Sequence, residues 1–211
     1  MAGPNKVILD YQPSIELKGI NSVNKIGIFS FIDNRENIDV KAYGTIVSLL
    51  TAELPIAFET QIKTETIISN YITNAFRNEL KSIGFKITDG NVYSKTLPFN
   101  KIENNLKEFE SLDVDKIIVG RIRFFRWTES NFAGLLFQGL MPKPRLSAEI
   151  QVQVIDKKSM KIQWAASGCA LEKSAANFPK NDERKSKIIL GLNKTLKKII
   201  SNDGFLNALM N

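Results

Sequence analysis

The chain has 211 residues, of which 43% are hydrophobic and 24% charged, a composition typical of a globular protein that forms a core without metals or disulfides. It contains no histidine, which excludes histidine-based catalytic triads and most transition-metal sites. The net charge of +7 fits an anionic partner such as phospholipid, lipopolysaccharide or nucleic acid, although solubility alone also explains it.

The amino-terminal part predicts an extended segment followed by a strand. Residues 6–11 (KVILDY) are apolar and lie just before Pro13, which favours an extended arm or an edge strand. Residues 25–32 (KIGIFSFI) predict the first buried strand. We therefore expect residues 1–24 to be a tether or edge strand, and residues 25–211 to form a single α+β domain.

Residues 64–83 predict the first helix, because apolar side chains recur there at every third or fourth position. Gly84 follows, where a left-handed residue often ends a helix. Residues 42–60 are also apolar, but Gly44 and Pro55 interrupt them. We interpret that stretch as a long loop or ribbon with a short helical or strand piece.

A short strand and two further helices are predicted after Gly84. Residues 85–88 form the strand, and Asn100 begins a helix with apolar residues up to Phe109. Asp182 is expected to cap a last helix, which ends near Ser201 and carries lysines on its outer side.

Three predicted strands form the centre of the domain, at residues 117–127, 146–155 and 160–171. In the second strand apolar and polar residues alternate, as they do when one face is buried. Its apolar members are Ala148, Ile150, Val152 and Val154. The polar residues 156–159 predict a hairpin turn. The expected fold is α+β: a mixed sheet with a carboxy-terminal antiparallel meander and two to three helices on one face, with helix 64–83 above the second strand.

No pattern for catalysis or cofactor binding occurs. Glycine-rich phosphate loops are absent, and we predict no cofactor, no metal and no enzymatic activity. The single cysteine, Cys169, lies in the third strand of the meander. We expect it to be a small buried residue, because no histidine is present to activate it.

Arginine and aromatic residues are interleaved over residues 121–127, a mixture that can bind single-stranded nucleic acid. Strict alternation places Arg121 and Arg123 with Phe125 and Trp127 on one face of the strand. It places Phe124 and Arg126 on the other. We interpret the segment as a partly solvated sheet face.

Several segments resemble small bacterial envelope lipoproteins. KIGIFSFIDNR resembles their opening strand, and LKSIGFKIT resembles their first helix and second strand. LDVDKIIVGRI and AEIQVQVIDKKSMKIQW are similar to a strand and a hairpin in the amino-terminal domain of TolB and its relatives. The chain thus resembles YajG-type lipoproteins, with the TolB amino-terminal-like α/β fold as the broader group.

The resemblance implies a non-enzymatic binding or assembly component on the periplasmic side of a bacterial membrane, as an outer-membrane lipoprotein. The lipidated cysteine would lie just before Ala2, outside this sequence. The expected partners are an envelope protein, the membrane surface or a second copy of the chain. The alternative is a cytosolic nucleic-acid-binding α/β protein that uses the basic meander and the lysine-rich last helix. A signal peptide upstream of Ala2 supports the first interpretation, and a native start at Met1 contradicts it.

A polar cluster follows the first predicted strand, at a position where functional groups often lie. It consists of Asp33, Asn34 and Arg35, with Glu36 beside them. Because Asp and Asn commonly form turns, we favour a turn with a local ion pair over a binding site.

The segment Asn131–Met141 joins two predicted strands and is unusually apolar for a hairpin loop. Its large apolar residues are Phe132, Leu135, Leu136, Phe137, Leu140 and Met141. Hairpin loops usually have about two to five residues, and longer ones are often functional. The loop is predicted either to cover the sheet or to be an interaction surface for a partner protein or a lipid surface.

We predict that Phe132, Leu136 and Phe137 contact something outside their own hairpin, since burying each is worth about 1.5–3 kcal/mol. Replacing residues 131–141 by an Asn-Gly turn tests this prediction. A lower melting temperature identifies the loop as core, most simply against residues 45–58. Unchanged stability with lost self-association or liposome binding identifies an interface. If all three properties are unchanged, the prediction is wrong.

Overall fold

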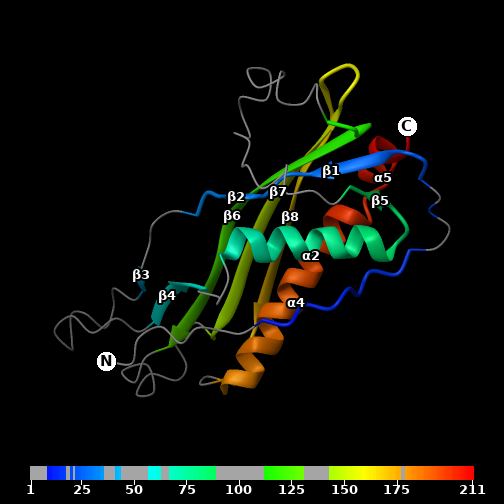
Figure 1. Ribbon diagram of the computed structural model, residues 1–211. Helices are drawn as coiled ribbons and strands as arrows, with labels where there is room; N and C mark the ends of the chain where they lie inside the picture. The colour runs from blue at the N-terminus through cyan, green and yellow to red at the C-terminus, as the bar shows by residue number, and fades with distance from the viewer. Residues whose placement is uncertain are drawn as a thin grey trace.

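The fold is a mixed sheet with helices packed on one face (Figure 1). The computed structural model describes residues 9–17, 20, 22–35, 41–43, 57–62, 67–88, 112–130, 143–176 and 179–211. The predicted α+β class and the carboxy-terminal antiparallel meander are confirmed. The predicted helix from Asn100 and the loop Asn131–Met141 lie outside the described residues.

The meander consists of three long strands. β6 (Lys116–Ser130) pairs antiparallel with β7 (Arg145–Asp156), and β7 pairs antiparallel with β8 (Lys161–Lys173). Each strand lies where the sequence predicts one, and its ends extend the predicted range by a few residues or shift it by one.

The other edge of β6 pairs with shorter strands. β1 (Lys25–Ile28) and β2 (Ile32–Asp33) run parallel to it, whereas β4 (Ala57–Gln61) runs antiparallel. β3 (Lys41–Tyr43) pairs with β4, and β5 (Lys86–Ile87) pairs with β1. The apolar ribbon expected at residues 42–60 therefore contributes strand residues at both of its ends.

Three helices cover one face of the sheet in the described part of the chain. α4 (Asn181–Ile200) and α5 (Asp203–Met210) pack on β7 and β8, whereas α2 (Ile68–Ser82) packs on β2 and β5. The expectation that the first helix lies above the second meander strand was therefore wrong. The strands that α2 contacts lie on the far side of β6, and the helix that follows β8 is the one that covers β7.

The alternation predicted for β7 is confirmed. Every second residue from Leu146 to Val154 is buried and belongs to the main core, and the polar residues between them are half-buried on the opposite face. A smaller apolar cluster covers one end of that opposite face. Its buried members are Phe29, Leu112, Val114, Ile117, Val119 and Ile155.

A β-bulge interrupts the pairing of β6 with β7. Ile122 lies opposite Ile150, but Phe124 lies opposite Glu149, so Arg123 is an additional residue in β6. One additional residue moves all later side chains of a strand to the other face.

The bulge explains why strict alternation failed for residues 121–127. Phe125 and Trp127 are buried in the main core beneath the helices. Arg121 pairs with Gln151 on the opposite face of the sheet. The predicted grouping of these arginine and aromatic side chains on one face was therefore wrong.

Gly84 ends α2 as the sequence predicts. Its φ is +102°, and its N–H donates to the carbonyl of Lys81 at 3.1 Å. The next N–H, that of Phe85, donates to the carbonyl of Leu80 at 3.0 Å, which completes a Schellman motif. A Cβ at Gly84 would lie 2.8 Å from the carbonyl oxygen of Ile20, so the close approach also requires glycine.

The start of α4 differs from the prediction. Lys180 is the N-cap residue and makes no side-chain capping bond, so the predicted Asp182 cap was wrong. Asp182 lies within the first turn, where a carboxylate interacts favourably with the helix dipole.

A buried carboxylate holds the amino-terminal segment against α2. Glu79 is fully buried and accepts hydrogen bonds from the Tyr11 hydroxyl and from the N–H groups of Ser14 (2.8 Å) and Ile15 (3.0 Å). Burial, followed by the contact with Glu79, raises the pKa of Tyr11 well above its ordinary value. Residues 9–17 therefore pack on the domain, while the predicted division of the chain at residue 24 stays a prediction.

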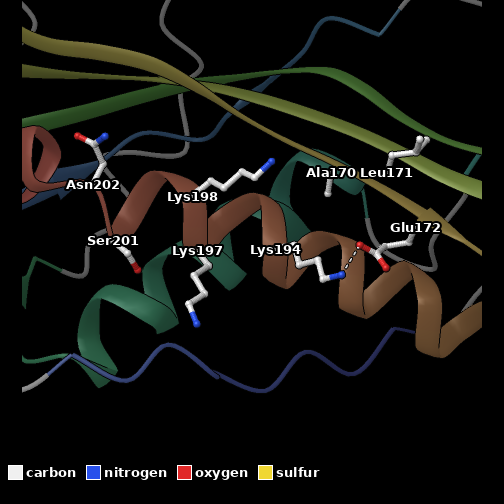
Figure 2. A pocket seen from close by; sticks show the side chains of 8 residues that line it. All are labelled: Ala170, Leu171, Glu172, Lys194, Lys197, Lys198, Ser201 and Asn202. Carbon is white, nitrogen blue, oxygen red and sulfur yellow. Dashed lines mark ion pairs between the residues drawn. The ribbon is translucent and has the colours of Figure 1, made fainter.

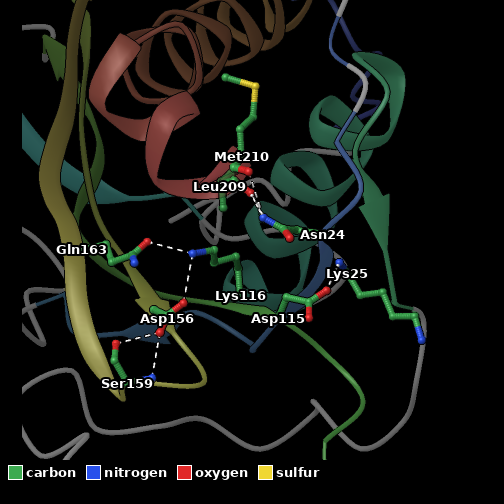
Figure 3. A network of polar contacts seen from close by, with 9 residues as sticks. All are labelled: Asn24, Lys25, Asp115, Lys116, Asp156, Ser159, Gln163, Leu209 and Met210. Atoms are coloured by element: carbon green, nitrogen blue, oxygen red, sulfur yellow. Dashed lines mark hydrogen bonds and ion pairs between the residues drawn. The ribbon is translucent and has the colours of Figure 1, made fainter.

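A buried lysine joins the ends of the three meander strands (Figure 3). Lys116 Nζ lies 3.0 Å from Asp156 Oδ2 and donates to Gln163 Oε1 at 3.0 Å. Asp156 Oδ1 also accepts bonds from Ser159 N (2.7 Å) and Ser159 Oγ (2.6 Å). Hydrogen bonds from the Ser159 hydroxyl, then from the Ser159 N–H and then from Lys116, hold the pKa of Asp156 at about 2.

Val152→Asp tests the register of the sheet. Val152 is fully buried, so we expect an unpaired carboxylate there to lower the free energy of unfolding by about 3–5 kcal/mol. Ser147→Asp, on the opposite face of the same strand, is the control and should change it by less than about 1 kcal/mol. Chemical denaturation measures both, and equal losses would contradict the register.

Asp156 predicts how stability depends on pH. Its folded-state pKa of about 2 lies below the value near 4 of an unfolded chain, so it contributes about 2 kcal/mol above pH ~4. This contribution is lost as the pH falls from ~4 to ~2. We expect Asp156→Asn to lower stability at pH 7 and to flatten the acid limb of the denaturation profile. Glu16→Gln, at an exposed residue, should leave that limb unchanged; an Asp156→Asn profile parallel to wild type would contradict this account.

Candidate interaction site at the edge of the sheet

The predicted polar cluster forms a local ion pair. Arg35 Nε donates to Asp33 Oδ1 at 2.7 Å and Arg35 Nη2 to Asp33 Oδ2 at 2.6 Å, while Nη1 reaches the carbonyl of Ile62 at 3.2 Å. The backbone N–H of Asn34 donates to the carbonyl of Ile122. This geometry fits the favoured interpretation as a turn with an ion pair, and any binding role of the cluster stays a prediction.

The arginine and aromatic residues of β6 contact one another on the face opposite the helices. The guanidinium carbon of Arg126 lies 4.7 Å from the centre of the Phe124 ring, and that of Arg123 lies 5.7 Å away. Arg121 Nε donates to Gln151 Oε1 at 2.5 Å. A nucleic acid base that stacked on Phe124 would have to compete with these cation–π contacts.

The six apolar residues predicted as an interaction surface, Phe132 to Met141, lie outside the described residues. Cys169 is described, and it is exposed, so the expectation of a buried cysteine was wrong. Its side chain points to the sheet face away from the helices. The adjacent Gly168 is buried beneath α4 instead.

β8 is an edge strand whose interior carries no charge. Among the described residues it pairs with β7 alone. Residues 162–171 (IQWAASGCAL) include neither a charged residue nor a proline. Proteins usually protect a long edge strand with charges, prolines or a covering segment, because an open edge pairs readily with other strands. In the described part of the chain this edge has no second strand, and its interior has no charge and no proline, so it is a candidate binding site.

The hydrogen bonds of β8 show which backbone groups face outward. Just after the end of β8, Ser174 N donates to the carbonyl of Pro144 at 2.7 Å. Pro144 directly precedes β7, so this bond continues the ladder between the two strands. Because backbone groups point alternately to the two sides of a strand, those of Ala170 and Gly168 also point to β7. Those of Ala165, Ser167, Cys169 and Leu171 point to the open edge. In agreement with this, Lys198 Nζ reaches the carbonyl of Cys169 at 2.8 Å.

A groove of about 560 Å³ lies between this edge and the second half of α4 (Figure 2). Its lining residues are Ala170, Leu171, Glu172, Lys194, Lys197, Lys198, Ser201 and Asn202. Glu172 is largely buried and forms an ion pair of 2.8 Å with Lys194. Lys197 and Lys198 are exposed, and Figure 2 shows Lys198 directed along the strand while Lys197 points away from it. The groove is therefore basic.

Gly168 brings α4 close to β8. A Cβ at this position would lie 2.3 Å from the backbone oxygen of Thr195 and 2.8 Å from Ile199. The close packing places the lysines of α4 beside the strand edge. Unpaired backbone groups next to a groove are what strand addition by an extended peptide requires.

The described residues do not point to metal chemistry or to a membrane-spanning helix. Among the described residues, no three metal-ligating side chains lie close enough together to hold a metal ion. No described helix is both long and apolar enough to cross a bilayer.

No protein-family model matches this sequence, and no curated protein matches it. Solved structures do resemble its fold. Protein XCC0632 from Xanthomonas campestris, assigned to family model DUF330, has a TM-score of 0.54 and 10% identity, covering 96% of this chain and 95% of that one. The hypothetical protein CT253 from Chlamydia trachomatis has a TM-score of 0.53 and 11% identity, covering 88% and 98%.

A further match is lipoprotein GNA1162 from Neisseria meningitidis, with a TM-score of 0.41 and 9% identity, covering 85% of this chain and 99% of that one. At these identities the likeness concerns the fold and not the activity. The likeness to YajG-type lipoproteins and to TolB therefore rests on the sequence segments alone.

Proposed function

We propose that this chain is a non-enzymatic binding or assembly component of the bacterial cell envelope, and that it engages a protein partner through the edge of β8. The observation that carries the proposal is the uncharged edge of β8 beside a basic groove, an edge on which no second strand pairs among the described residues. Placement on the periplasmic side, as an outer-membrane lipoprotein, is supported by the resemblance of two sequence segments to envelope lipoproteins and of two others to the amino-terminal domain of TolB and its relatives.

The location is tested by fractionating cells of the organism that carries the gene. We expect the native protein in the membrane fraction, released by detergent and labelled by radioactive palmitate. Recovery of the protein in the cytosol would contradict the proposal. If the cytosolic protein sediments in large complexes that nuclease treatment dissolves, the nucleic-acid-binding alternative is favoured.

The binding surface is tested in the same cells with the photo-crosslinking residue p-benzoylphenylalanine. It replaces Leu171 at the β8 edge or, as a matched control, Leu190 on α4; both leucines are partly exposed, at 52% and 38%. We expect a discrete protein adduct in the envelope fraction from position 171 and none from position 190. Equal adducts at both positions, or none at either, would contradict a binding role for this edge.

A further inference from the structure

We propose that the β8 edge binds an acidic, extended segment of a partner protein, which joins the sheet as an additional strand with its carboxylates in the groove beside α4. This inference rests on the proposed function, and it specifies the chemistry of the partner.

The backbone of β8 supplies the first part of the recognition. The N–H and C=O groups of Ala165, Ser167 and Leu171 point outward, at the spacing that an added strand needs. The carbonyl of Cys169 accepts a hydrogen bond from the Lys198 ammonium group. An added strand would take over this carbonyl with its own N–H, and the Lys198 ammonium would then be available to a carboxylate of the incoming segment.

The side chains beside the edge supply the second part. In an added strand, alternate side chains would lie on the two faces of the extended sheet. One set would lie beside the exposed Leu171 and Cys169, where apolar or β-branched residues fit. The other set would enter the groove next to Lys198, with Lys197 on the groove's outer side, where Asp or Glu fits. The partner segment should therefore alternate acidic and apolar residues.

Charge argues against a second copy of the chain as the occupant. Two antiparallel β8 strands related by a twofold axis would bring both α4 helices onto the same face of one continuous sheet. Lys197 and Lys198 of each copy would then approach those of the other. The acidic residue of the groove, Glu172, is already paired with Lys194 and is largely buried. A segment that brings its own carboxylates avoids this repulsion.

Peptide binding to the full chain tests the proposal. The probe is a fluorescein-labelled nonapeptide in which glutamate alternates with threonine and valine, measured by fluorescence anisotropy. A peptide with lysine in place of glutamate should bind at least about tenfold more weakly. Two N-methylated versions carry the methyl groups on odd or on even residues. Because only alternate amides face β8, one version should lose binding and the other should keep it.

Matched protein variants locate the site. Replacing both lysines, as Lys197→Gln with Lys198→Gln, should weaken binding of the glutamate peptide about tenfold. The control variant, Lys185→Gln with Lys187→Gln, removes the same charge from the same helix but outside the groove. It should weaken binding of the glutamate peptide less than about twofold. Ser167→Pro removes an outward N–H that β7 does not use, and should also weaken binding, whereas Ser167→Ala should not. Thermal melting establishes that each variant is folded.

Three results would overturn the inference. Equal binding of both N-methylated peptides would exclude strand addition, and equal binding of the lysine peptide would exclude recognition of acidic side chains. A dimer in sedimentation equilibrium that Ser167→Pro dissociates would identify a second copy as the occupant. If the crosslink from position 171 is found while the glutamate peptide fails to bind, this inference is wrong and the proposed function stands.

Discussion

The antiparallel ladder between β6 and β7 determines where the other elements of the fold lie. It extends from Lys116 opposite Asp156 to Thr128 opposite Arg145, and it sets which side chains of both strands face the helices. The main core lies on one face and a smaller apolar cluster on part of the other. The bulge at Arg123 keeps Phe125 and Trp127 in the main core after the register changes. At one end, the buried ammonium of Lys116 requires the carboxylate of Asp156, because an unpaired charge there would be strongly destabilising.

The proposed binding edge follows from this ladder. β7 uses one edge for β6, so β8 can join only at the other, and it becomes the last strand on that side in the described part of the chain. α4 then packs across β7 and β8, and Gly168 lets it lie close to the strand. The same packing that buries Leu192, Leu196 and Ile199 leaves the lysines of the last two helical turns beside the open backbone. Stability and the candidate site thus share one set of contacts.

The parts of the fold that depend on local pattern could be predicted from the sequence. The alternation in β7, the apolar stripe of α2 and the glycine at its end each result from interactions between residues close in the chain. The bulge at Arg123 could not be predicted, because it depends on the partner strand and leaves no mark in the composition of β6. The error for Cys169 has a related cause: an edge strand exposes one face if nothing covers it, and the sequence does not show which strand is last. For the site, the signal was an uncharged run, residues 162–171, bounded by Lys161 and Glu172 and followed by a lysine-rich helix. This run could be recognised as an edge only once the strand order was known.

Amide hydrogen exchange along β8, followed residue by residue by NMR, measures whether the outer edge of this strand is open. We expect the amides that point to β7 to be strongly protected; they are those of Ala166, Gly168, Ala170 and Glu172. We expect rapid exchange for the amides that point to the open edge, which are those of Ala165, Ser167, Cys169 and Leu171. Equal and strong protection of both sets in the isolated chain would show that the edge is already paired or covered, and would contradict the account.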